Sequence, residues 1–330
     1  MASELNIMRQ LWPYIWSRQN PKQKLNVVIF VIATLFATAI FLSVPIFLKQ
    51  VISQFENPNQ LSLFSPITCV ILFGLFWMLS KIIDRLRHQS VFPIIANIIH
   101  RLCLDLFAHL QLLAMDFHQN RHSGEVLNIV SRTRFAIADF TIGLAQEILP
   151  IVIRILFASF LLINFYGWQY GAVLLTMFVI YSILAIKSAP IIVAKRRVQN
   201  AVDGVANGFI VDSLLNAETV KYFTAEQREL KQARDLLTQK QQADEDSLRA
   251  DAKIHLLQNS IIGCAVIVLT LISGLAVAKQ QMQLADFVMI NSYILMFMAP
   301  LSALGFRYRQ VKDQVTKIEA AFKLLQTRIR

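Results

Sequence analysis

Hydrophobic residues gather in six long runs along the chain, and polar residues fill the stretches between them. Each run has close to the ~20 residues that an α-helix needs to cross the apolar core of a bilayer. The runs are Leu25 to Leu48, Leu63 to Ser80, Ala145 to Ile163, Gln169 to Ile186, Leu256 to Ala278 and Ala285 to Gly305. The pattern therefore predicts an all-α membrane protein with six long transmembrane helices.

The spacing of the six runs is very uneven. About 64 residues separate the second run from the third and about 69 separate the fourth from the fifth, whereas the connections after the third and fifth runs have only a few residues. Both long stretches contain few residues that break helices. At 1.5 Å per residue, a run of about 28 residues extends a helix roughly 40 Å beyond the bilayer. Each long stretch is therefore predicted to be a hairpin of extended helices with a turn at its far tip.

Composition and charge exclude a soluble domain and set the orientation. The chain is 55% hydrophobic and 16% charged, which lies outside the range of soluble domains of this size. Of its 32 Lys and Arg residues, Lys49 and Lys279 fall in predicted outer loops and Arg154 falls within a run, which leaves 29 on the inner side. Cytoplasmic loops retain positive charge, so both termini are predicted to be cytoplasmic. This bias and anionic lipid headgroups account for the net charge of +11 without a nucleic-acid partner.

Cysteine and histidine residues indicate neither a disulfide framework nor a metal site. Cys69, Cys103 and Cys264 form no CxxC motif. His118 and His122 could share one helical face, but no third metal ligand is evident. We therefore expect no metal in this chain.

The N-terminal segment differs from a cleaved signal peptide in length and charge layout. Between Leu5 and Trp16 it combines three aromatic residues with five aliphatic or methionine residues. This composition predicts an amphipathic helix that lies on the inner face of the membrane.

The two tips of the hairpins can be located from turn residues. The segment MDFHQNRHSG, from Met115 to Gly124, interrupts the helical periodicity, which suits a short transverse segment and a new helix that starts before Glu125. The segment LLNAETVKYFTAE, from Leu214 to Glu226, combines apolar side chains with a charged rim. That composition is expected of a surface that docks a partner, and an ordinary turn between solvated helices is the alternative.

Four segments together resemble one family of membrane transporters. They are DFHQNRHSG at the first tip, KRRVQNAVD from Lys195 to Asp203, LLNAETVKYFTAE at the second tip, and DFVMINSYILMFMAPLSALGFRYRQ from Asp286 to Gln310. In this order they resemble the transmembrane half of the mitochondrial iron-sulfur-linked and heavy-metal-tolerance ABC exporters and their bacterial relatives. The resemblance covers nearly the whole chain.

The resemblance implies a six-helix subunit of the type 1 ABC exporter architecture that forms homodimers in a lipid membrane. It implies an interfacial helix over residues 1–24, a transmembrane domain over 25–310 and a helical linker over 311–330 that leads toward a nucleotide-binding domain. Members of the family are similar in exporting glutathione disulfide or glutathione-linked thiol and metal species. The bacterial inner membrane is the preferred location, ahead of the mitochondrial inner membrane.

The resemblance also assigns roles to particular residues. The residues that would couple to the nucleotide-binding domain are Asp116, Phe117 and His118 at the first tip and Glu218, Lys221 and Tyr222 at the second. The residues that would bind substrate are Arg132, Arg134, Arg197, Asn200 and Asn291. Arginine can bind the carboxylates of a peptide-like anion in bidentate fashion. Contact with phospholipid, or simple surface charge, is the alternative role for these arginines.

The chain departs from the family pattern at several positions. Arg154 stands where the family usually carries glutamate, and a cation within a span is costly. It therefore indicates either a water-filled cavity or a partner such as Glu147, which lies on the same helical face at i,i+7. In the sixth run, Met296, Ser302 and Gln310 replace a glutamine, an asparagine and an acidic residue, so the predicted cavity has fewer amides and is more cationic than in relatives.

Among the 330 residues there is no GxxxxGK[ST] loop, so no phosphate-binding cradle is predicted. We therefore expect this chain not to hydrolyse ATP alone and to hold no cofactor, with ATP and Mg²⁺ bound by a partner nucleotide-binding domain. The leading hypothesis is the permease part of an ATP-driven exporter that works by alternating access. A non-transporting remnant or membrane scaffold with the exporter fold is the alternative.

Overall fold

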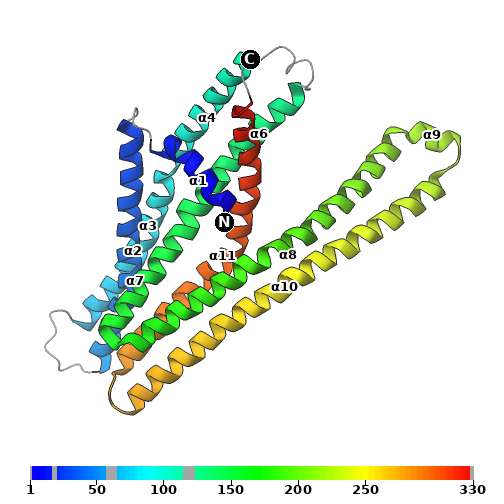
Figure 1. Cartoon of the computed structure of the whole chain (residues 1–330). Helices are drawn as coiled ribbons and strands as arrows, with labels where there is room; N and C mark the ends of the chain where they lie inside the picture. Colours follow the sequence, from blue (N-terminus) through cyan, green and yellow to red (C-terminus); the bar gives the residue numbers. More distant parts are fainter. Residues whose placement is uncertain (1, 17–20, 57–64, 114–122, 328–330) are drawn as a thin grey trace. The chain divides into compact units, whose positions relative to one another are not determined.

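The computed structural model describes residues 2–16, 21–56, 65–113 and 123–327, and these ranges are helical with no β-strand. Figure 1 shows the elements in chain order. They are α1 (Ala2–Ile15), α2 (Pro21–Glu56), α3 (Pro66–Ser90), α4 (Phe92–Leu112), α6 (Ser123–Thr141), the π-helix η1 (Ile142–Ile148), α7 (Leu149–Tyr166), α8 (Trp168–Leu215), α9 (Ala217–Tyr222), α10 (Glu226–Ala278) and α11 (Leu284–Leu325). Six helical stretches are long and apolar enough to cross a membrane, which confirms the predicted number of spans.

Local sequence signals set several helix ends. Ser65 caps α3, since its hydroxyl accepts a hydrogen bond from the backbone N–H of Thr68 at 3.3 Å, and Pro66 follows at the first helical position. At the start of α11, the side chains of Gln283 and Asp286 form a reciprocal capping box. Gly167 separates α7 from α8 with φ of 107°, a conformation that favours glycine. The turn between these helices is therefore as short as the sequence predicts.

The chain divides into two compact units, which we describe separately. The first contains residues 1–179 and 264–330, and the second contains residues 180–263. In the first unit, α2 packs along α3 and also against α11, which in turn packs against α6. Apolar side chains of α1, α2, α4, α6 and α11 form one buried cluster at its centre. This cluster holds together helices that are far apart in the sequence.

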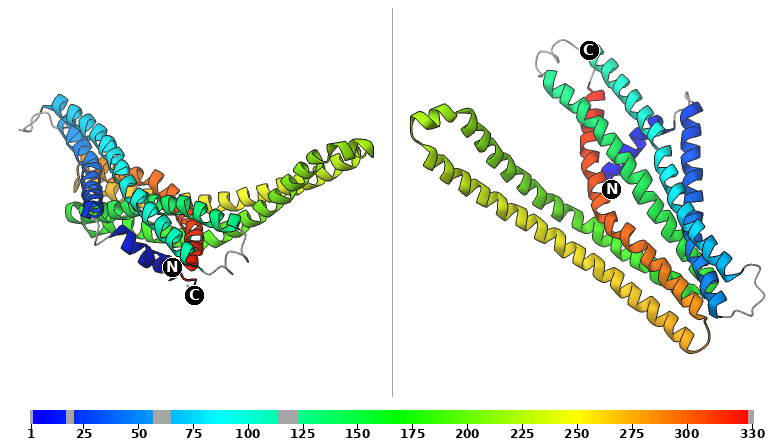
Figure 2. Two further views of the ribbon diagram at one scale, coloured as in Figure 1. Left: turned by 90° about the horizontal axis from the view of Figure 1, so that it is seen from above. Right: turned by 180° about the vertical axis from the view of Figure 1, so that it is seen from behind.

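The second unit is a helical hairpin with α9 across its tip, and Figures 1 and 2 show its two long arms side by side. The arms belong to α8 and α10, and polar pairs join them along their length. Lys195 Nζ lies 3.0 Å from Asp246 Oδ2, and the amide of Gln199 donates to Asp244 Oδ1 at 2.9 Å. The predicted hairpin of the second long stretch is thus confirmed. The tip of the first stretch lies outside the described residues, and α6 begins at Ser123, just before Glu125 as predicted.

The second span extends further along the chain than its hydrophobic run indicates. The rings of Phe47 and Phe76 lie 4.1 Å apart, and Phe30 shares the buried cluster with Val91 and Ile95. Because antiparallel helices advance equally per residue, the segment level with Leu25–Leu48 covers about residues 76–99. The helix therefore continues to Ser90, beyond the predicted limit at Ser80, and the charged residues between 81 and 88 lie level with the apolar run of α2.

The N-terminal helix α1 is amphipathic, as its composition predicts. Ile7 and Leu11 are only 1% exposed and belong to the central cluster, whereas Trp12 and Trp16 are exposed. One face of α1 therefore packs on α4 and α11. Its position on the inner membrane face stays a prediction.

The π-helix η1 packs unusually closely on α11. A methyl group built on Gly143 would lie 2.6 Å from Cγ2 of Val311, and the branched side chain of valine has little freedom to turn away. A glycine is therefore required for this approach of the two backbones.

We expect Gly143→Ala to destabilise the protein by about 1–2 kcal/mol, because the added methyl group overpacks the contact with Val311. Gly204→Ala is the matched control, since nothing lies within 4 Å of the added group there and alanine favours the helix. Thermal unfolding in detergent should show a lower melting temperature for the first variant and an equal or higher one for the second. Equal melting temperatures would contradict the close contact.

Candidate functional site

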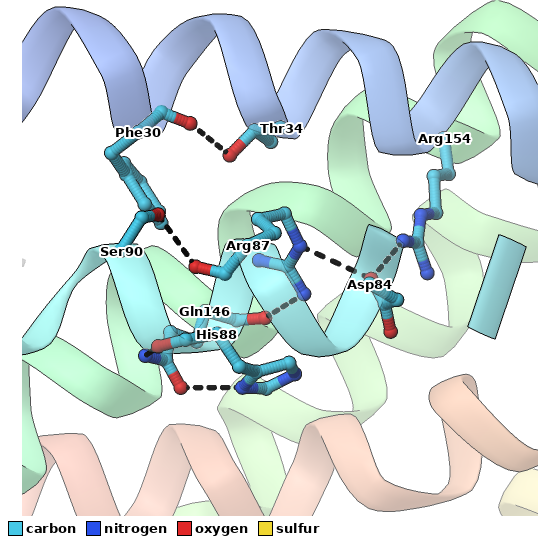
Figure 3. Close-up of polar contacts among 8 residues, drawn as sticks. All are labelled: Phe30, Thr34, Asp84, Arg87, His88, Ser90, Gln146 and Arg154. Atoms are coloured by element: carbon cyan, nitrogen blue, oxygen red, sulfur yellow. Dashed lines mark hydrogen bonds and ion pairs between the residues drawn. The ribbon is translucent and has the colours of Figure 1, made fainter. Parts of the chain in front are cut away.

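A cluster of charged and polar side chains lies inside the first unit, at the level of the middle of α2. Its centre is the Asp84 carboxylate of α3, whose Oδ1 accepts from Arg154 Nη2 at 2.6 Å and from Arg87 Nε at 3.1 Å (Figure 3). Arg87 is 2% exposed and Arg154 8% exposed. The Arg154 guanidinium also lies 4.2 Å from the ring centroid of Phe41, a cation–π contact. One carboxylate thus neutralises two buried cations from α3 and α7.

Arg87 also contacts the neighbouring π-helix. Gln146 lies in η1, where backbone hydrogen bonds run from each carbonyl to the N–H five residues further on. Arg87 Nη2 donates to the Gln146 backbone carbonyl at 3.2 Å. This bond supplies the buried guanidinium with a second acceptor besides Asp84.

His88 and Gln146 form a reciprocal pair beside this contact (Figure 3). The amide Nε2 of Gln146 donates to the backbone carbonyl of His88 at 2.7 Å, and His88 Nδ1 lies 2.6 Å from Gln146 Oε1. Since an amide oxygen only accepts, Nδ1 carries the proton in this arrangement. The pair joins the end of α3 to η1 at the same depth as the Asp84 cluster.

The structure corrects the expected partner of Arg154. Glu147 forms an ion pair with Arg307 of α11, and Arg154 pairs with Asp84. The predicted pairing of Arg154 with Glu147 is therefore wrong. Asp84 had been assigned to an inner loop, so the sequence interpretation did not consider it as a partner at this depth.

The cluster binds helices together and leaves an excess of positive charge. Asp84 and Glu147 face three arginines, namely Arg87, Arg154 and Arg307. Within the described residues, no group of three His, Cys, Asp or Glu side chains could hold a metal ion. The arrangement therefore offers electrostatic stabilisation, chiefly of anions, and its visible role is to tie α3, α7, η1 and α11 together.

A second polar site joins the C-terminal ends of α2 and α7 to the start of α11. Lys49 Nζ lies 2.6 Å from Asp286 Oδ1, and the hydroxyl of Tyr166 donates to the same oxygen at 2.6 Å. Asp286 is thus shared by a cation and a phenol, and it also caps α11. Lys49 and Asp286 therefore neutralise each other at this end of the helices.

The predicted substrate residues do not form one group in the structure. Arg132 and Arg134 are exposed on α6, and two residues along a helix point about 200° apart. Asn291 joins α10 to α11, where it accepts from the hydroxyl of Thr270 at 2.6 Å. The remaining two, Arg197 and Asn200, are exposed on α8 in the second unit. Substrate binding by these five residues stays a prediction.

The tip of the second unit presents large apolar side chains to solvent. Tyr222 is 85% exposed and Phe223 is 77% exposed, at the end of α9. Lys221 Nζ pairs with Glu226 Oε1 at 2.9 Å, and Glu218 lies in the first turn of α9. Exposed aromatic groups with a charged rim are typical of a docking surface. Beside them is a largely apolar cavity of about 320 Å³ between the end of α8 and the start of α10.

The corresponding residues of the first tip, Asp116, Phe117 and His118, lie outside the described residues. The sequence interpretation also missed Asp84, Arg87, His88 and Gln146. A signal was available, because the charged segment from Lys81 to His88 is followed within a few residues by the apolar residues of α4. Together they could have been read as one interrupted span.

The chain matches the family model described as the ABC transporter transmembrane region over residues 27–301. It is 30% identical over 330 residues to ABC transporter B family member 6 of Dictyostelium discoideum, a match that covers 99% of this chain and 47% of that protein. It is 27% identical over 333 residues to the mitochondrial iron-sulfur clusters transporter ATM1 of Saccharomyces cerevisiae, with 99% and 48% covered. The chain thus spans about half the length of these relatives.

A solved structure with a similar fold is that of a bacterial Atm1-family ABC exporter with ATP bound. The TM-score is 0.69 at 24% sequence identity, and the match covers 93% of this chain and 54% of the other. This likeness confirms the predicted arrangement of six long helices as an exporter fold.

Because Asp84 pairs with two arginines, we expect loss of its charge to destabilise the protein more than loss of one arginine. We expect Asp84→Asn to destabilise the protein by about 3–5 kcal/mol, because it leaves Arg87 and Arg154 buried without a counterion. Arg154→Met should cost less than half as much, since Asp84 keeps its pair with Arg87. Unfolding in detergent by heat or by denaturant measures both values.

Asp313→Asn is the control for loss of a carboxylate at an exposed position, where Asp313 accepts from Lys317 at 2.7 Å. It should change stability by no more than about 0.5 kcal/mol. Equal effects of Asp84→Asn and Arg154→Met would show that Asp84 does not serve two arginines.

Proposed function

The chain belongs to the ABC transporter transmembrane-region family, and from this premise we propose that it is the permease part of an ATP-driven exporter of glutathione disulfide or glutathione-linked thiol and metal species. The observation that carries the exporter mechanism is the exposed aromatic tip at α9, at the end of a long helical hairpin. A solvent-exposed apolar tip on such an arm needs a protein partner to cover it.

The partner in this proposal is a nucleotide-binding domain, which supplies ATP hydrolysis with Mg²⁺. The 330 residues contain no phosphate-binding loop, and the relatives that they match are about twice as long. Two copies of the chain would form the transport pathway between them. Both termini would face the cytoplasm, because the lysine and arginine bias places the long stretches on that side. The bacterial inner membrane is the proposed location.

The hairpin can transmit motion because its arms are joined along their length. Ion pairs and hydrogen bonds link Lys195 to Asp246 and Gln199 to Asp244, and a further ion pair links Lys240 to Asp203. A displacement of α9 by a closing partner would therefore move α8 and α10 as one body. This is the rigid element that alternating access requires.

The cargo assignment rests on charge. Glutathione disulfide carries several carboxylates, and arginine forks bind carboxylates with two parallel hydrogen bonds. Arg132 and Arg134 are exposed on α6, and the Asp84 cluster adds net positive charge among the spans. The curated relative from Saccharomyces cerevisiae is named for iron-sulfur clusters, which is consistent with a thiol-linked cargo.

Tyr222→Ala tests the docking role of the tip. Loss of a central aromatic anchor typically costs ~2 kcal/mol or more of binding energy, so binding of the nucleotide-binding domain should weaken at least about tenfold. Leu237→Ala, on the exposed side of α10 away from the tip, is the control and should bind normally. Affinity can be measured by pull-down of the nucleotide-binding domain at graded concentrations. Unchanged affinity of Tyr222→Ala for the nucleotide-binding domain would contradict the proposed docking role of α9.

Arg132→Ala tests the cargo. Loss of a charge-assisted hydrogen bond should weaken binding of glutathione disulfide about tenfold or more, as measured by calorimetry on the purified dimer. Arg132→Lys should restore part of the affinity, because it keeps the charge and loses the fork. If the wild-type protein binds no glutathione species, the cargo is wrong while the exporter assignment stands. If Arg132→Ala binds as well as the wild type, the site is elsewhere.

A further inference from the structure

A cavity of about 1010 Å³ lies between α1, α4 and the end of α11 in the first unit. Its lining has two different parts. One part is aromatic and aliphatic, with Trp12 of α1, Trp16 directly after α1, and Leu104 of α4. The other part is polar and holds Arg101 and Asp105 of α4. A cavity with both characters fits a ligand that has a charged group and a hydrocarbon body.

The polar part contains one cation, Arg101, and one anion, Asp105, whose side chains can form further hydrogen bonds. Tyr14 donates to Asp105 Oδ2 at 2.7 Å, and burial together with this bond raises the pKa of the Tyr14 phenol well above its usual range, so the phenol remains a donor. Oδ1 of Asp105 accepts no hydrogen bond within the described residues, and Arg101 makes none there either. Arg101 and Asp105 are four residues apart, so they lie one above the other on α4, about 6 Å apart along the helix axis.

The cavity lies at the level where the apolar part of α2 begins. The register of α2 against α3 and α4, fixed by the Phe47–Phe76 contact, places Arg101 beside residues 22–24. Leu25, the first residue of the apolar run, follows directly. Trp12 and Trp16 stack with ring centroids 6.5 Å apart and are exposed, as is common for tryptophan at a membrane interface. This is the depth of lipid headgroups.

We propose that this cavity binds one zwitterionic phospholipid with a primary ammonium headgroup, of the phosphatidylethanolamine class. Arg101 binds the phosphate through its guanidinium fork, and the free oxygen of Asp105 accepts from the ammonium. The tryptophan rings and Leu104 cover the glycerol and the upper acyl chains. A quaternary ammonium has no N–H for Asp105, and an anionic headgroup without an ammonium leaves the Asp105 carboxylate facing negative charge. The site therefore selects the ethanolamine headgroup.

The bound lipid would join three elements that the sequence separates widely. Phe322 and Leu325 at the end of α11 complete the wall opposite α1. Occupancy therefore fixes the end of α11 against α1 and α4. This role is independent of the cargo and of the docking tip.

The test uses Trp12 and Trp16 as reporters in the purified chain, with Trp77→Phe and Trp168→Phe to remove the other two tryptophans. Phospholipids with brominated acyl chains and ethanolamine, choline or glycerol headgroups are titrated in detergent, and quenching of fluorescence is measured. We expect half-maximal quenching at about tenfold lower concentration for the ethanolamine lipid than for the other two. Equal quenching by all three lipids would overturn the proposal.

Variants separate the two polar contacts. Arg101→Gln should weaken binding of the ethanolamine lipid about tenfold. Asp105→Asn keeps an oxygen for the bond from Tyr14 and should remove the preference for the ethanolamine headgroup over choline. Arg9→Gln is the control, because Arg9 is exposed on α1 outside the cavity lining. Wild-type behaviour of Arg101→Gln, or an equal loss with Arg9→Gln, would overturn the assignment.

A last arm distinguishes a lipid from a soluble ligand. Glycerophosphoethanolamine, which has the headgroup without acyl chains, should fail to displace the brominated lipid even in large excess. Displacement at a concentration similar to that of the lipid would show that the cavity takes a soluble phosphodiester instead. Each variant is first checked for an unchanged melting temperature, so that loss of quenching reports binding.

Discussion

The Asp84 carboxylate is the contact on which the packing of the first unit depends, because it neutralises two buried arginines. Arginine inside a bilayer is tolerated only when it is paired or reaches water. Arg87 is fixed on one side by Asp84 and on the other by the backbone carbonyl of Gln146. Arg154 is fixed by Asp84 and by the face of Phe41. The positions of α3, η1 and α7 relative to one another are therefore set by charge as well as by shape.

The second unit is stabilised by a different kind of interaction from the first. It has few buried apolar residues, and its two arms are joined by exposed ion pairs and hydrogen bonds spaced along the helices. Each exposed pair contributes ~0–1 kcal/mol, so the hairpin owes its stiffness mainly to the backbone hydrogen bonds of two long helices. Such an arm can project from the membrane without a core of its own, and the large apolar groups at its tip are then available to a partner.

Much of this arrangement could be predicted from the sequence. Six apolar runs gave the number of spans, and the second long polar stretch gave a hairpin with its tip at Leu214 to Glu226, because these features depend on local patterns. The predicted end of the second span was too early. The charged residues between Lys81 and His88 lower the local hydropathy of the sequence, and the partners of Arg87 and Asp84 on other helices cannot be seen in it. The predicted partner of Arg154 was wrong for the same reason. A search along its own helix finds Glu147, whereas Asp84 comes close only in the packed structure. The substrate residues follow from resemblance, and no contact in the structure decides them.

The contacts along the first unit differ in kind from its predicted outer end to its predicted inner half, and this difference bears on motion. At the outer end, α2, α7 and α11 meet through Lys49, Asp286 and Tyr166, and Lys49 is 36% exposed, so water can replace its bonds when the helices separate. In the inner half, α2, α4, α6 and α11 share a cluster of fully buried side chains, and each large member would expose apolar surface worth ~1.5–3 kcal/mol on separation. Opening these helices at the outer end therefore costs less than opening them within the cluster. In the proposed export mechanism, outward release of the cargo requires the weaker contacts at that end.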